Sequence, residues 1–568
     1  MMTMLGPEAT VGQFLAARLA QLGANHVFGL PGDFNLTLLD QMLTVEDLEW
    51  VGTTNELNAS YAADAYARVG RRLGAVVTTF GVGELSAING LAGSYAEDVP
   101  VVHIVGMPST TAMERGLPLH HTVLDGDFER GVRVAREFTV AQAVLGRTGA
   151  ATDIDRVLTV VLTASKPGFL GIPLDVAALP VAQEVDPAPL TLTGSRPDAL
   201  AAFEKALRSH VDGAGTATLL AGPRIHRRGL EHLVRSLADL PGVQVAAQSG
   251  SKAILDECHP ASLGTYLAAT SVDVATRDLV DEAELLIMVG TVTSDFTTGF
   301  FSNRYVAEEA VELGLDSARI GYAHYPGVML HDALAALHRV LEAARLPPRR
   351  AHVTTATGRR PEAHGTAAPE PDAPLDHAAL WPAIQQWIMP GTTLIAEAGT
   401  SFYGALDLRL PERSDLLGQP IWSSIGYTLP AALGAGLSRP DHRPVLFIGD
   451  GSLQLTATEL GTLYQRVPQA VVFLLENRGY TVERCIQSPH AVYQDILAWD
   501  WPAVPAALCA PQVHTPRVGT LSGLEGVLAE VTDRPADGFF ITVDLPMMDA
   551  PRLLRVLTEG IGTLNARD

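Results

Sequence analysis

The chain has 568 residues, of which 47% are hydrophobic and 18% charged, a globular composition long enough for several domains. With 40 Lys and Arg against 63 Asp and Glu, the net charge is −23 and no basic cluster offsets it, which argues against a nucleic-acid partner. The three cysteines, Cys258, Cys485 and Cys509, show no CxxC spacing, so we expect a reducing compartment, the cytoplasm. We find no signal-peptide pattern and no apolar run of about 18 residues, so we expect no membrane span.

Helical patterns alternate with short apolar runs in chain order. Residues 10–22 carry apolar side chains at helical spacing, and Gly23 follows as the expected C-terminal cap of this helix. The apolar runs at 26–30, 75–80 and 101–106 predict buried strands. The same alternation continues through the rest of the chain, with predicted strands at 216–222, 243–248, 285–290, 392–399, 445–450, 471–476 and 539–545.

Continuous apolar strands separated by helices are typical of parallel sheets that are covered on both faces. Two stretches rich in Pro, Thr and Ala, residues 182–198 and 346–375, are predicted linkers. The sequence therefore predicts an α/β fold of three doubly wound parallel-sheet domains, at residues 1–185, 197–345 and 375–555.

One strand–helix–strand segment carries polar residues at both strand ends. The strand VLFIGD ends at Asp450 and the strand VVFLLE is followed by Asn477, and such a unit places the carboxyl ends of its parallel strands side by side. A carboxylate, an amide oxygen and the backbone carbonyl of Gly479 suit Mg²⁺, and the amides of Gly451 and Ser452 suit a phosphate. Gly-Asp-Gly alone is also explained by a strand-end turn, but the spacing to Asn477 favours a magnesium–diphosphate site.

This segment resembles the thiamine diphosphate motif, in which GDG is followed about 25 residues later by Asn; Glu476 and Arg478 depart from the usual residues of that motif. Five further segments resemble the thiamine diphosphate-dependent 2-oxo acid decarboxylases, which include pyruvate, indolepyruvate and branched-chain 2-keto acid decarboxylases: residues 28–35, 53–68, 119–128, 418–435 and 477–484. The resemblance covers nearly the whole chain and implies a pyrimidine-binding, a central and a diphosphate-binding domain, in that order.

The resemblance also implies the cofactor contacts. Glu56 would bond the N1′ atom of the aminopyrimidine and so promote formation of the ylide, although a carboxylate in the first turn of a helix is common without such a role. Ile425 would hold the cofactor bent, and the carbonyl of Ser423 would face N4′. The implied cofactor contacts are Thr400, Ser423, Ser424, Ile425, Asp450, Gly451, Ser452, Asn477, Gly479 and Tyr480, with Mg²⁺ on Asp450, Asn477 and Gly479.

Asp33, His120, His121 and Glu483 match the acid–base residues of the decarboxylases. Decarboxylation through an enamine ends in a protonation and in aldehyde release, which need groups that titrate near neutral pH. Taken singly, Asp33 is explained by a turn, and an adjacent His pair by exposure or a metal. A metal is disfavoured because no Cys–His spacing lies nearby.

Four residues match substrate-pocket positions: Phe296, Ala398, Phe402 and Val482. They favour different substrates. An aromatic residue at the position of Phe402 resembles the branched-chain and indole-type enzymes, whereas a bulky residue at the position of Phe296 resembles the pyruvate decarboxylases. Each is also explained as an ordinary core residue. One methylene changes preference only modestly, so the 2-oxo acid stays open among branched-chain, aromatic and pyruvate-type substrates.

The predicted activity is nonoxidative decarboxylation of a 2-oxo acid to an aldehyde and CO₂, a carbon–carbon lyase reaction. The alternative is a thiamine diphosphate-dependent carboligase or synthase, against which the LHHT segment at 119–122 argues. A dinucleotide-dependent oxidoreductase is disfavoured because no GxGxxG follows the first strand, and a non-catalytic binder because it needs no proton relay. In the family two subunits complete each site, which implies a homodimer at minimum and an expected homotetramer.

Overall fold

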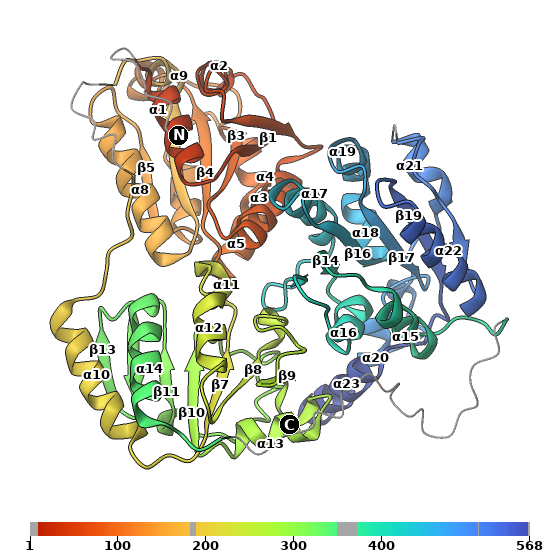
Figure 1. Cartoon of the computed structure of the whole chain (residues 1–568). Helices are drawn as coiled ribbons and strands as arrows, with labels where there is room; N and C mark the ends of the chain where they lie inside the picture. Colours follow the sequence, from red (N-terminus) through yellow and green to blue (C-terminus); the bar gives the residue numbers. More distant parts are fainter. Residues whose placement is uncertain (1–8, 182–188, 349–371, 509, 566–568) are drawn as a thin grey trace. The chain divides into compact units, whose positions relative to one another are not determined.

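The computed structural model describes residues 9–181, 189–348, 372–508 and 510–565 (Figure 1). Its described part holds a six-stranded, a seven-stranded and a second six-stranded sheet, each combined with helices, which confirms the predicted α/β fold of three parallel-sheet domains. The predicted domain boundaries stay predictions. Of the two predicted linkers, residues 182–188 and 349–371 lie outside the described residues.

Contacts group the chain into two compact units. The first consists of Met1–Thr193, Leu429–Pro440 and Thr458–Val467, and the second of Gly194–Thr428, Asp441–Ala457 and Pro468–Asp568. The first unit therefore contains the first sheet, together with α19 (Leu460–Arg466) and nearly all of α17 (Thr428–Ser438), and the second unit contains the other two sheets. Across the described residues, every helix is too short or too polar to cross a membrane.

The first sheet is parallel throughout and has the order β2 (Glu49–Gly52), β1 (His26–Gly29), β3 (Gly74–Thr79), β4 (Val101–Met107), β6 (Gly168–Pro173) and β5 (Ala141–Val144). All residues of β3, β4 and β6 are buried, which the apolar runs predict for β3 and β4. One face packs against α1 (Val11–Gln21), α2 (Leu36–Met42) and α8 (Ala150–Ala164). The other face lies against α3 (Glu56–Gly70), α5 (Ile88–Ala96) and α7 (Arg130–Arg136).

Local signals set the limits of α1. Thr10 accepts a hydrogen bond from the backbone N–H of Gln13 at 3.2 Å, and the Gln13 side chain accepts one from the N–H of Thr10 at 3.0 Å, which is a complete capping box. Gly23 has φ = 81° just after the helix, the left-handed conformation that glycine adopts without strain. The helix expected over residues 10–22 is therefore confirmed.

The central sheet has the order β13 (Ala323–Pro326), β12 (Ser317–Ile320), β11 (Val311–Leu313), β10 (Leu285–Val289), β7 (Ala217–Ala221), β8 (Val243–Ala247) and β9 (Ser262–Thr265). Strands β12 and β13 are antiparallel, which differs from the purely parallel sheet that we expected. Only three residues join β11 to β12, and the N–H of Gly314 donates to the Ser317 carbonyl at 2.8 Å. Such a short turn permits only an antiparallel pair.

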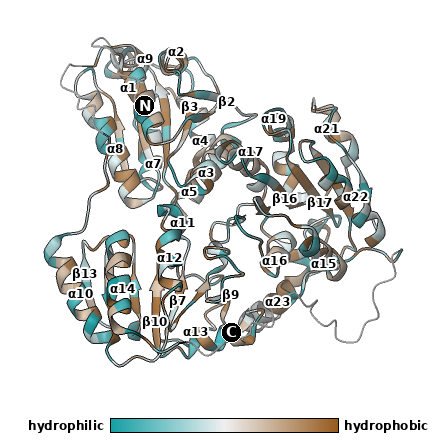
Figure 2. Ribbon diagram, viewed as in Figure 1, coloured by the Kyte–Doolittle hydropathy of each residue, from teal (hydrophilic) through white to brown (hydrophobic). Residues whose placement is uncertain are grey.

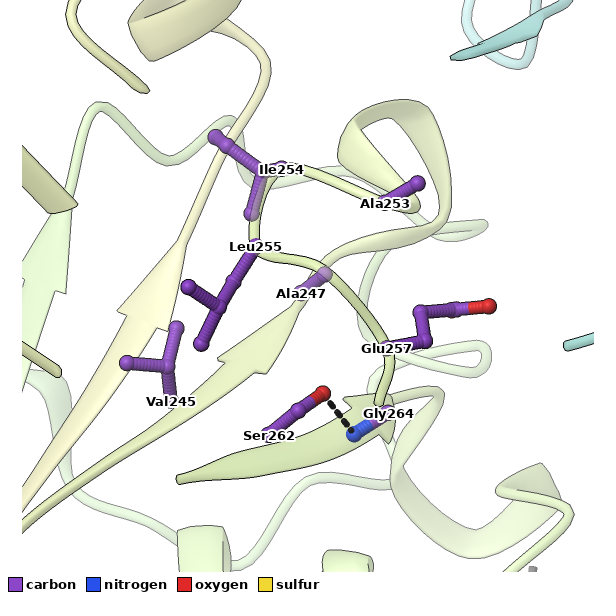
Figure 3. Close-up of a pocket in the computed structure, with 8 residues that line it drawn as sticks. All are labelled: Val245, Ala247, Ala253, Ile254, Leu255, Glu257, Ser262 and Gly264. Carbon is purple, nitrogen blue, oxygen red and sulfur yellow. Dashed lines mark hydrogen bonds between the residues drawn. The ribbon is translucent and has the colours of Figure 1, made fainter. Parts of the chain in front are cut away.

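A small pocket lies beside β8 and β9 and has mostly apolar walls (Figure 3). Its acidic residue, Glu257, is already engaged: one carboxylate oxygen accepts from Lys252 Nζ and the other from the backbone N–H of Leu410, both at 2.6 Å. Ser262 Oγ accepts from the N–H of Gly264 at 3.4 Å. The pocket is therefore a packing crevice, and Glu257 serves to join the central domain to the C-terminal one.

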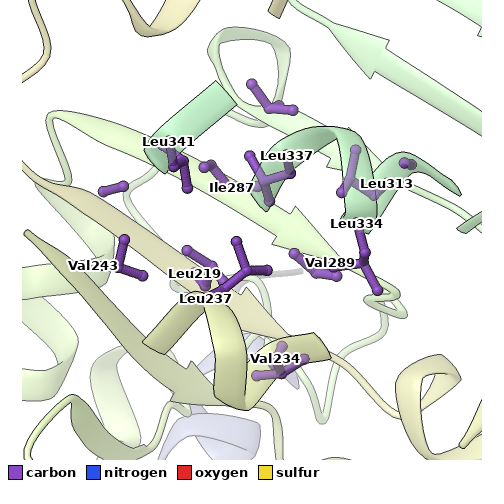
Figure 4. Close-up of a cluster of buried hydrophobic side chains, with 14 of the residues drawn as sticks. Leu219, Val234, Leu237, Val243, Ile287, Val289, Leu313, Leu334, Leu337 and Leu341 are labelled. Carbon is purple, nitrogen blue, oxygen red and sulfur yellow. The ribbon is translucent and has the colours of Figure 1, made fainter. Parts of the chain in front are cut away.

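The core of the central domain lies where α12 (Glu231–Ala238) and α14 (Leu330–Ala344) cover the sheet. Leu337 and Leu341 from α14 and Val234 and Leu237 from α12 approach strand residues such as Ile287 (Figure 4). All of these side chains are buried, and burying each one contributes about 1.5–3 kcal/mol relative to exposure.

The third sheet is parallel, in the order β15 (Asp415–Leu417), β14 (Thr392–Ala396), β16 (Arg443–Gly449), β17 (Val471–Glu476), β19 (Phe539–Asp544) and β18 (Arg517–Val518). Strands β16 and β17 are strongly hydrophobic (Figure 2). Between them the rings of Phe447 and Phe473 stack at 4.5 Å. The helices α15 (His377–Trp387), α16 (Thr400–Leu406) and α22 (Leu521–Asp533) contribute to the same core.

The first and third sheets each reverse their winding at one point. In the first, the chain leaves β1 towards β2 and leaves β3 towards β4; in the third, it leaves β14 towards β15 and β16 towards β17. Ligands of doubly wound proteins bind at such switch points, outside the carboxyl ends of the strands. The residues that follow β1, β2 and β3, and those that follow β14, β16 and β17, are therefore the candidate site residues.

Candidate functional site

Asp450 and Asn477 follow the neighbouring strands β16 and β17, which pair in parallel with Gly449 opposite Leu475. The Asp450 carboxylate is buried, and its two oxygens accept from the backbone N–H of Gly451 at 2.8 Å and of Arg478 at 2.6 Å. Burial raises the pKa of Asp450 to about 6, although these backbone hydrogen bonds lower it. The expectation that the two residues lie at one edge of the sheet is confirmed.

The donors at this edge fit a magnesium ion. Asn477 Oδ1 is buried and has no hydrogen-bond partner among the described residues. The hydrogen bonds that orient the neighbouring Asp450 carboxylate come from backbone N–H groups and not from a basic side chain. A buried oxygen without a donor costs about 1–3 kcal/mol, which a cation would relieve. Mg²⁺ prefers oxygen ligands of these types, so the residues fit the predicted ion.

Two glycines of the segment have no room for a side chain. A Cβ on Gly451 would lie 2.6 Å from the Tyr480 ring, and Gly479 has φ = 138° with its Cβ position 2.1 Å from the Gln494 carbonyl. Gly451 and Ser452 lie in the first turn of α18 (Asp450–Thr456). The close approach of backbone and ring explains why both glycines are needed here.

The loop 419–428 contains the predicted contacts Ser423, Ser424 and Ile425. Ser423 has φ = 52°, the left-handed region in which glycine is common, so the serine adopts the backbone conformation that a glycine would allow. Gln419 holds the loop, because its side-chain oxygen accepts from the N–H of Ser424 at 2.9 Å. Ile425 is 36% exposed, a high value for a large apolar side chain in an ordered loop.

Glu397 directly follows β14 and is a residue that our sequence reasoning missed. It is fully buried and accepts hydrogen bonds from the Ala398 N–H at 3.0 Å, the Gly426 N–H at 3.2 Å and the Thr428 hydroxyl at 2.6 Å. Burial raises its pKa to about 7, against those hydrogen bonds. Glu397 thereby ties the start of α16, with Thr400, to the loop 419–428. An acidic residue straight after a buried strand, as at Asp450, was the available signal.

Asp33, His120 and His121 lie together in the first unit. His120 Nε2 is 2.9 Å from Asp33 Oδ2, and the two imidazole rings are 4.6 Å apart. Phe34 stacks on His120 at 5.0 Å, which orients its ring. His121 has φ = 61°, and its carbonyl lies 2.0 Å from the Cβ position of Gly81, so only glycine fits at residue 81. The structure thus assembles three of the four predicted acid–base residues.

Glu56 is the first residue of α3 and follows β2. Its carboxylate lies against α4 (Val82–Ser86), with Oε1 3.0 Å from the Cβ position of Gly83. The N-cap Asn55 accepts from the N–H of Asn58 at 2.8 Å and sets the start of the helix. Glu56 is therefore held at the carboxyl end of β2 by its strand and by the helix cap, with its carboxylate beside Gly83, which follows β3.

Glu84, on α4, is the second acidic residue that sequence reasoning missed. Its carboxylate is buried, accepts from the N–H of Gly81 at 2.9 Å and lies 2.2 Å from the Cβ position of Gly131. Burial raises its pKa to about 7. No sequence pattern indicates this burial, since Glu84 stands in a short segment between Val82 and Leu85 that has no clear periodicity.

The remaining predicted residues belong to the second unit. Val482 and Glu483 lie on α20 (Thr481–Ile486), and Val482 Cγ2 is 3.3 Å from the Cβ position of Gly399, which places Val482 beside the segment of Ala398. Glu483 is exposed and belongs to a different unit from Asp33 and the two histidines. Its place in the acid–base set stays a prediction.

Phe296 of the central domain and Phe402 of α16 line one small apolar pocket, although they are far apart in the sequence. Its other walls are Ser249, Leu267, Tyr403, Leu406 and Leu557. The rings of Phe296 and Tyr403 stack at 6.4 Å. Leu557 on α23 (Arg552–Asn565) was not predicted, whereas Ala398 and Val482 do not line this pocket.

Comparisons with known proteins cover all three domains. The family model described as "Thiamine pyrophosphate enzyme, N-terminal TPP binding domain" matches residues 9–126. The models of the central domain and of the "C-terminal TPP binding domain" of the same enzymes match residues 205–341 and 399–536. Proteins named "Alpha-keto-acid decarboxylase" are similar over nearly their whole length. The protein of Mycolicibacterium paratuberculosis is 41% identical over 96% of both chains, and that of Mycobacterium ulcerans 39% identical over 98% of this chain and 97% of its own.

The protein of Mycobacterium tuberculosis with the same name is 40% identical over 98% of both chains. These matches confirm the resemblance inferred from the sequence, and the thiamine diphosphate-binding domains confirm the cofactor class. The chain therefore belongs to the thiamine pyrophosphate enzymes, within the family of the alpha-keto-acid decarboxylases.

Proposed function

We propose that the protein decarboxylates a 2-oxo acid without oxidation and releases an aldehyde and CO₂. The observation that carries this proposal is the assembly of Asp33, His120 and His121 in a chain with the domains of a thiamine pyrophosphate enzyme. Removal of CO₂ leaves a carbon that must be protonated, and a hydrogen-bonded Asp–His pair beside a second imidazole supplies groups for that transfer. The full-length similarity to proteins named alpha-keto-acid decarboxylase supports the same reaction.

Thiamine diphosphate, when bound, supplies the electron sink that protein side chains lack. Asp450, Asn477 and the Gly479 carbonyl are the proposed ligands of its Mg²⁺, supported by the unpartnered Asn477 oxygen. The other proposed cofactor contacts are Thr400, Ser423, Ser424, Ile425, Gly451, Ser452 and Tyr480. Their support is the constrained backbone at Ser423 and at the two glycines of the segment.

Five acidic and basic side chains have proposed roles in the proton transfers. Glu56 would share a proton with the pyrimidine N1′ atom. Its carboxylate lies against α4, and among the described residues no basic side chain donates a hydrogen bond to it, so it is available to a ligand. Asp33 and His121 would protonate the carbon that loses CO₂ and assist aldehyde release, with His120 orienting Asp33 through their 2.9 Å contact. Glu483 would act near the departing carboxylate.

The substrate pocket is proposed to accept an apolar side chain. Phe296 and Phe402 share a pocket whose walls are apolar except for Ser249 and the hydroxyl of Tyr403, so a charged substrate side chain would lose its hydration there without a partner. Ala398 and Val482 are proposed to line the approach to it. Branched-chain, aromatic and pyruvate-type 2-oxo acids all satisfy this requirement.

We propose a homodimer at minimum and a homotetramer as the working assembly. Apolar side chains stand exposed beside the candidate residues of each unit: Val82 at 55% and Leu85 at 51% in the first, and Leu455 at 55% with Ile425 in the second. Such exposed apolar groups are typical of surfaces that a partner covers. The scarcity of cysteine, three in 568 residues, supports a cytoplasmic location.

A panel of 2-oxo acids tests the proposed function. Pyruvate, 2-oxoisovalerate, phenylpyruvate and indolepyruvate should each be incubated with and without thiamine diphosphate and Mg²⁺, and the aldehyde and CO₂ quantified. We expect equal amounts of the two products, dependent on cofactor, from at least one substrate. Acyloin as the main product would instead identify a carboligase. No turnover of any member would contradict the proposal.

A further inference from the structure

We propose that Asp33, His120 and His121 form a binding site for a divalent transition ion such as Zn²⁺, and that the bound ion inhibits the enzyme. The inhibitory part rests on the proposed function, in which these residues transfer protons. The binding part rests on the geometry of the three side chains alone.

Each of the three residues offers one ligand atom, and these atoms lie within 4.8 Å of one another, the one such group among the described residues. Asp33 Oδ2 and His120 Nε2 are already 2.9 Å apart. Ligands about 2.1 Å from a tetrahedral Zn²⁺ lie roughly 3.4 Å from each other. Side-chain movements of at most about 1.5 Å therefore suffice to close the site.

The ligands are held in place before any ion binds. Phe34 stacks on the His120 ring, and its edge packs against the His121 ring at 5.9 Å. The backbone at His121 is fixed by its contact with Gly81. His121 Nδ1 is buried and has no hydrogen-bond partner among the described residues, so a small movement of this ring towards an ion breaks no hydrogen bond at that atom.

The donor set selects the type of ion. Two imidazoles and one carboxylate suit Zn²⁺ and other late first-row ions, whereas Mg²⁺ prefers oxygen ligands and is proposed to bind at Asp450 and Asn477. The side chains of Asp33 and His120 are 51% and 60% exposed, so an ion can enter and a fourth coordination position stays open. The net charge of −23 favours accumulation of cations near the protein.

The ion would inhibit because a coordinated imidazole nitrogen no longer has a lone pair for a proton. Metal binding requires neutral imidazole and ionised carboxylate and competes with protons for the same atoms. With the site filled, His121 and Asp33 could no longer carry the proton that the reaction requires. The enzyme would keep its cofactor and lose turnover.

The test measures metal binding directly on the cofactor-loaded enzyme in excess Mg²⁺. Equilibrium dialysis with Zn²⁺, and the visible absorption of added Co²⁺, should be compared between the wild type, Asp33→Asn and the double variant His120→Gln/His121→Gln. The matched control is His331→Gln, because His331 forms an exposed pair with Asp332 at 3.3 Å but has no third ligand.

We expect one Zn²⁺ per chain in the wild type and in His331→Gln, and an affinity at least about tenfold weaker in both site variants. Zn²⁺ should also abolish wild-type turnover, and a chelator with Mg²⁺ in excess should restore it. Equal Zn²⁺ binding by the double variant, or relief of inhibition by Mg²⁺ alone, would overturn the proposal. Zn²⁺ binding by a protein that turns over no 2-oxo acid would instead refute the proposed function and leave the metal site standing.

Discussion

The backbone N–H of Gly81 donates a 2.9 Å hydrogen bond to the buried carboxylate of Glu84, while the Cα of Gly81 packs directly against the His121 carbonyl. Glu84 therefore supports, through one glycine, the backbone that presents the histidine pair. Because burial raises the pKa of Glu84 to about 7, its protonation state changes near neutral pH.

Glu84→Gln should change how stability depends on pH. The folded state holds the Glu84 proton up to about pH 7 and the unfolded chain releases it near pH 4.5, so the wild type loses stability as pH rises through that window. The loss is on the order of 3 kcal/mol. Gln cannot ionise and can still accept from Gly81, so the melting temperature of the variant relative to the wild type should rise between pH 5 and pH 8. A difference that stays constant over this range would contradict the burial of an ionisable Glu84.

Glu397→Gln should weaken cofactor binding. Both carboxylate oxygens of Glu397 accept hydrogen bonds, from Ala398 on one side and from Gly426 and Thr428 on the other. The amide nitrogen of Gln cannot accept and would face a donor on one of these sides. An unmet group of this kind costs about 1–3 kcal/mol, or roughly a 5- to 150-fold loss of affinity if the loop 419–428 must be held to bind. The measurement is a thiamine diphosphate titration followed by the tryptophan fluorescence of the protein, to which Trp422 in this loop contributes.

The matched control for Glu397 is Glu412→Gln, an exposed glutamate of the same domain. This variant should bind thiamine diphosphate as the wild type does. If Glu397→Gln also bound the cofactor with wild-type affinity while its melting temperature fell, the role of Glu397 would be structural only.

Asn477→Ala should separate metal binding from folding. Its Oδ1 atom has no hydrogen-bond partner among the described residues, so removing it leaves no backbone donor unpaired. Asp450→Ala, in contrast, leaves the N–H groups of Gly451 and Arg478 without their acceptor. Without cofactor, we expect the free energy of unfolding of Asn477→Ala to lie within about 1 kcal/mol of the wild-type value. Half-maximal activity should need at least about tenfold more Mg²⁺ in this variant. An unchanged Mg²⁺ requirement would rule Asn477 out as a ligand.

Glu56→Gln should abolish most of the turnover and leave cofactor binding in place. Loss of a proton-transfer group of this kind costs about 10²–10⁴ in rate. The first-turn position of Glu56 tolerates Gln, because the helix cap comes from Asn55. The control is Glu46→Gln, an exposed residue before β2. The measurements are kcat and the thiamine diphosphate dissociation constant, and near-wild-type kcat would refute the assignment.

Much of the site could be predicted because it depends on local connectivity. A right-handed strand–helix–strand unit makes its two parallel strands neighbours, so Asp450 and Asn477 had to lie at one sheet edge. The buried strands and the first helix followed from apolar runs and from the capping residues around Thr10. Resemblance to a family supplied the grouping of Asp33 with His120, which no spacing along the chain could have shown.

Tertiary packing alone decided the rest. Glu84 looks like an ordinary surface glutamate in the sequence, and the place of Glu397 after a buried strand is only a weak signal; non-local contacts bury both side chains, and this burial raises their pKa values to about 7. Phe296 and Phe402 meet in one pocket because two domains pack together within the second unit. The sequence by itself determined which elements form and which residue types end the strands, because both depend on local periodicity and composition. Burial, and with it the acidity of each carboxylate, depends on the chain segments that fold over it.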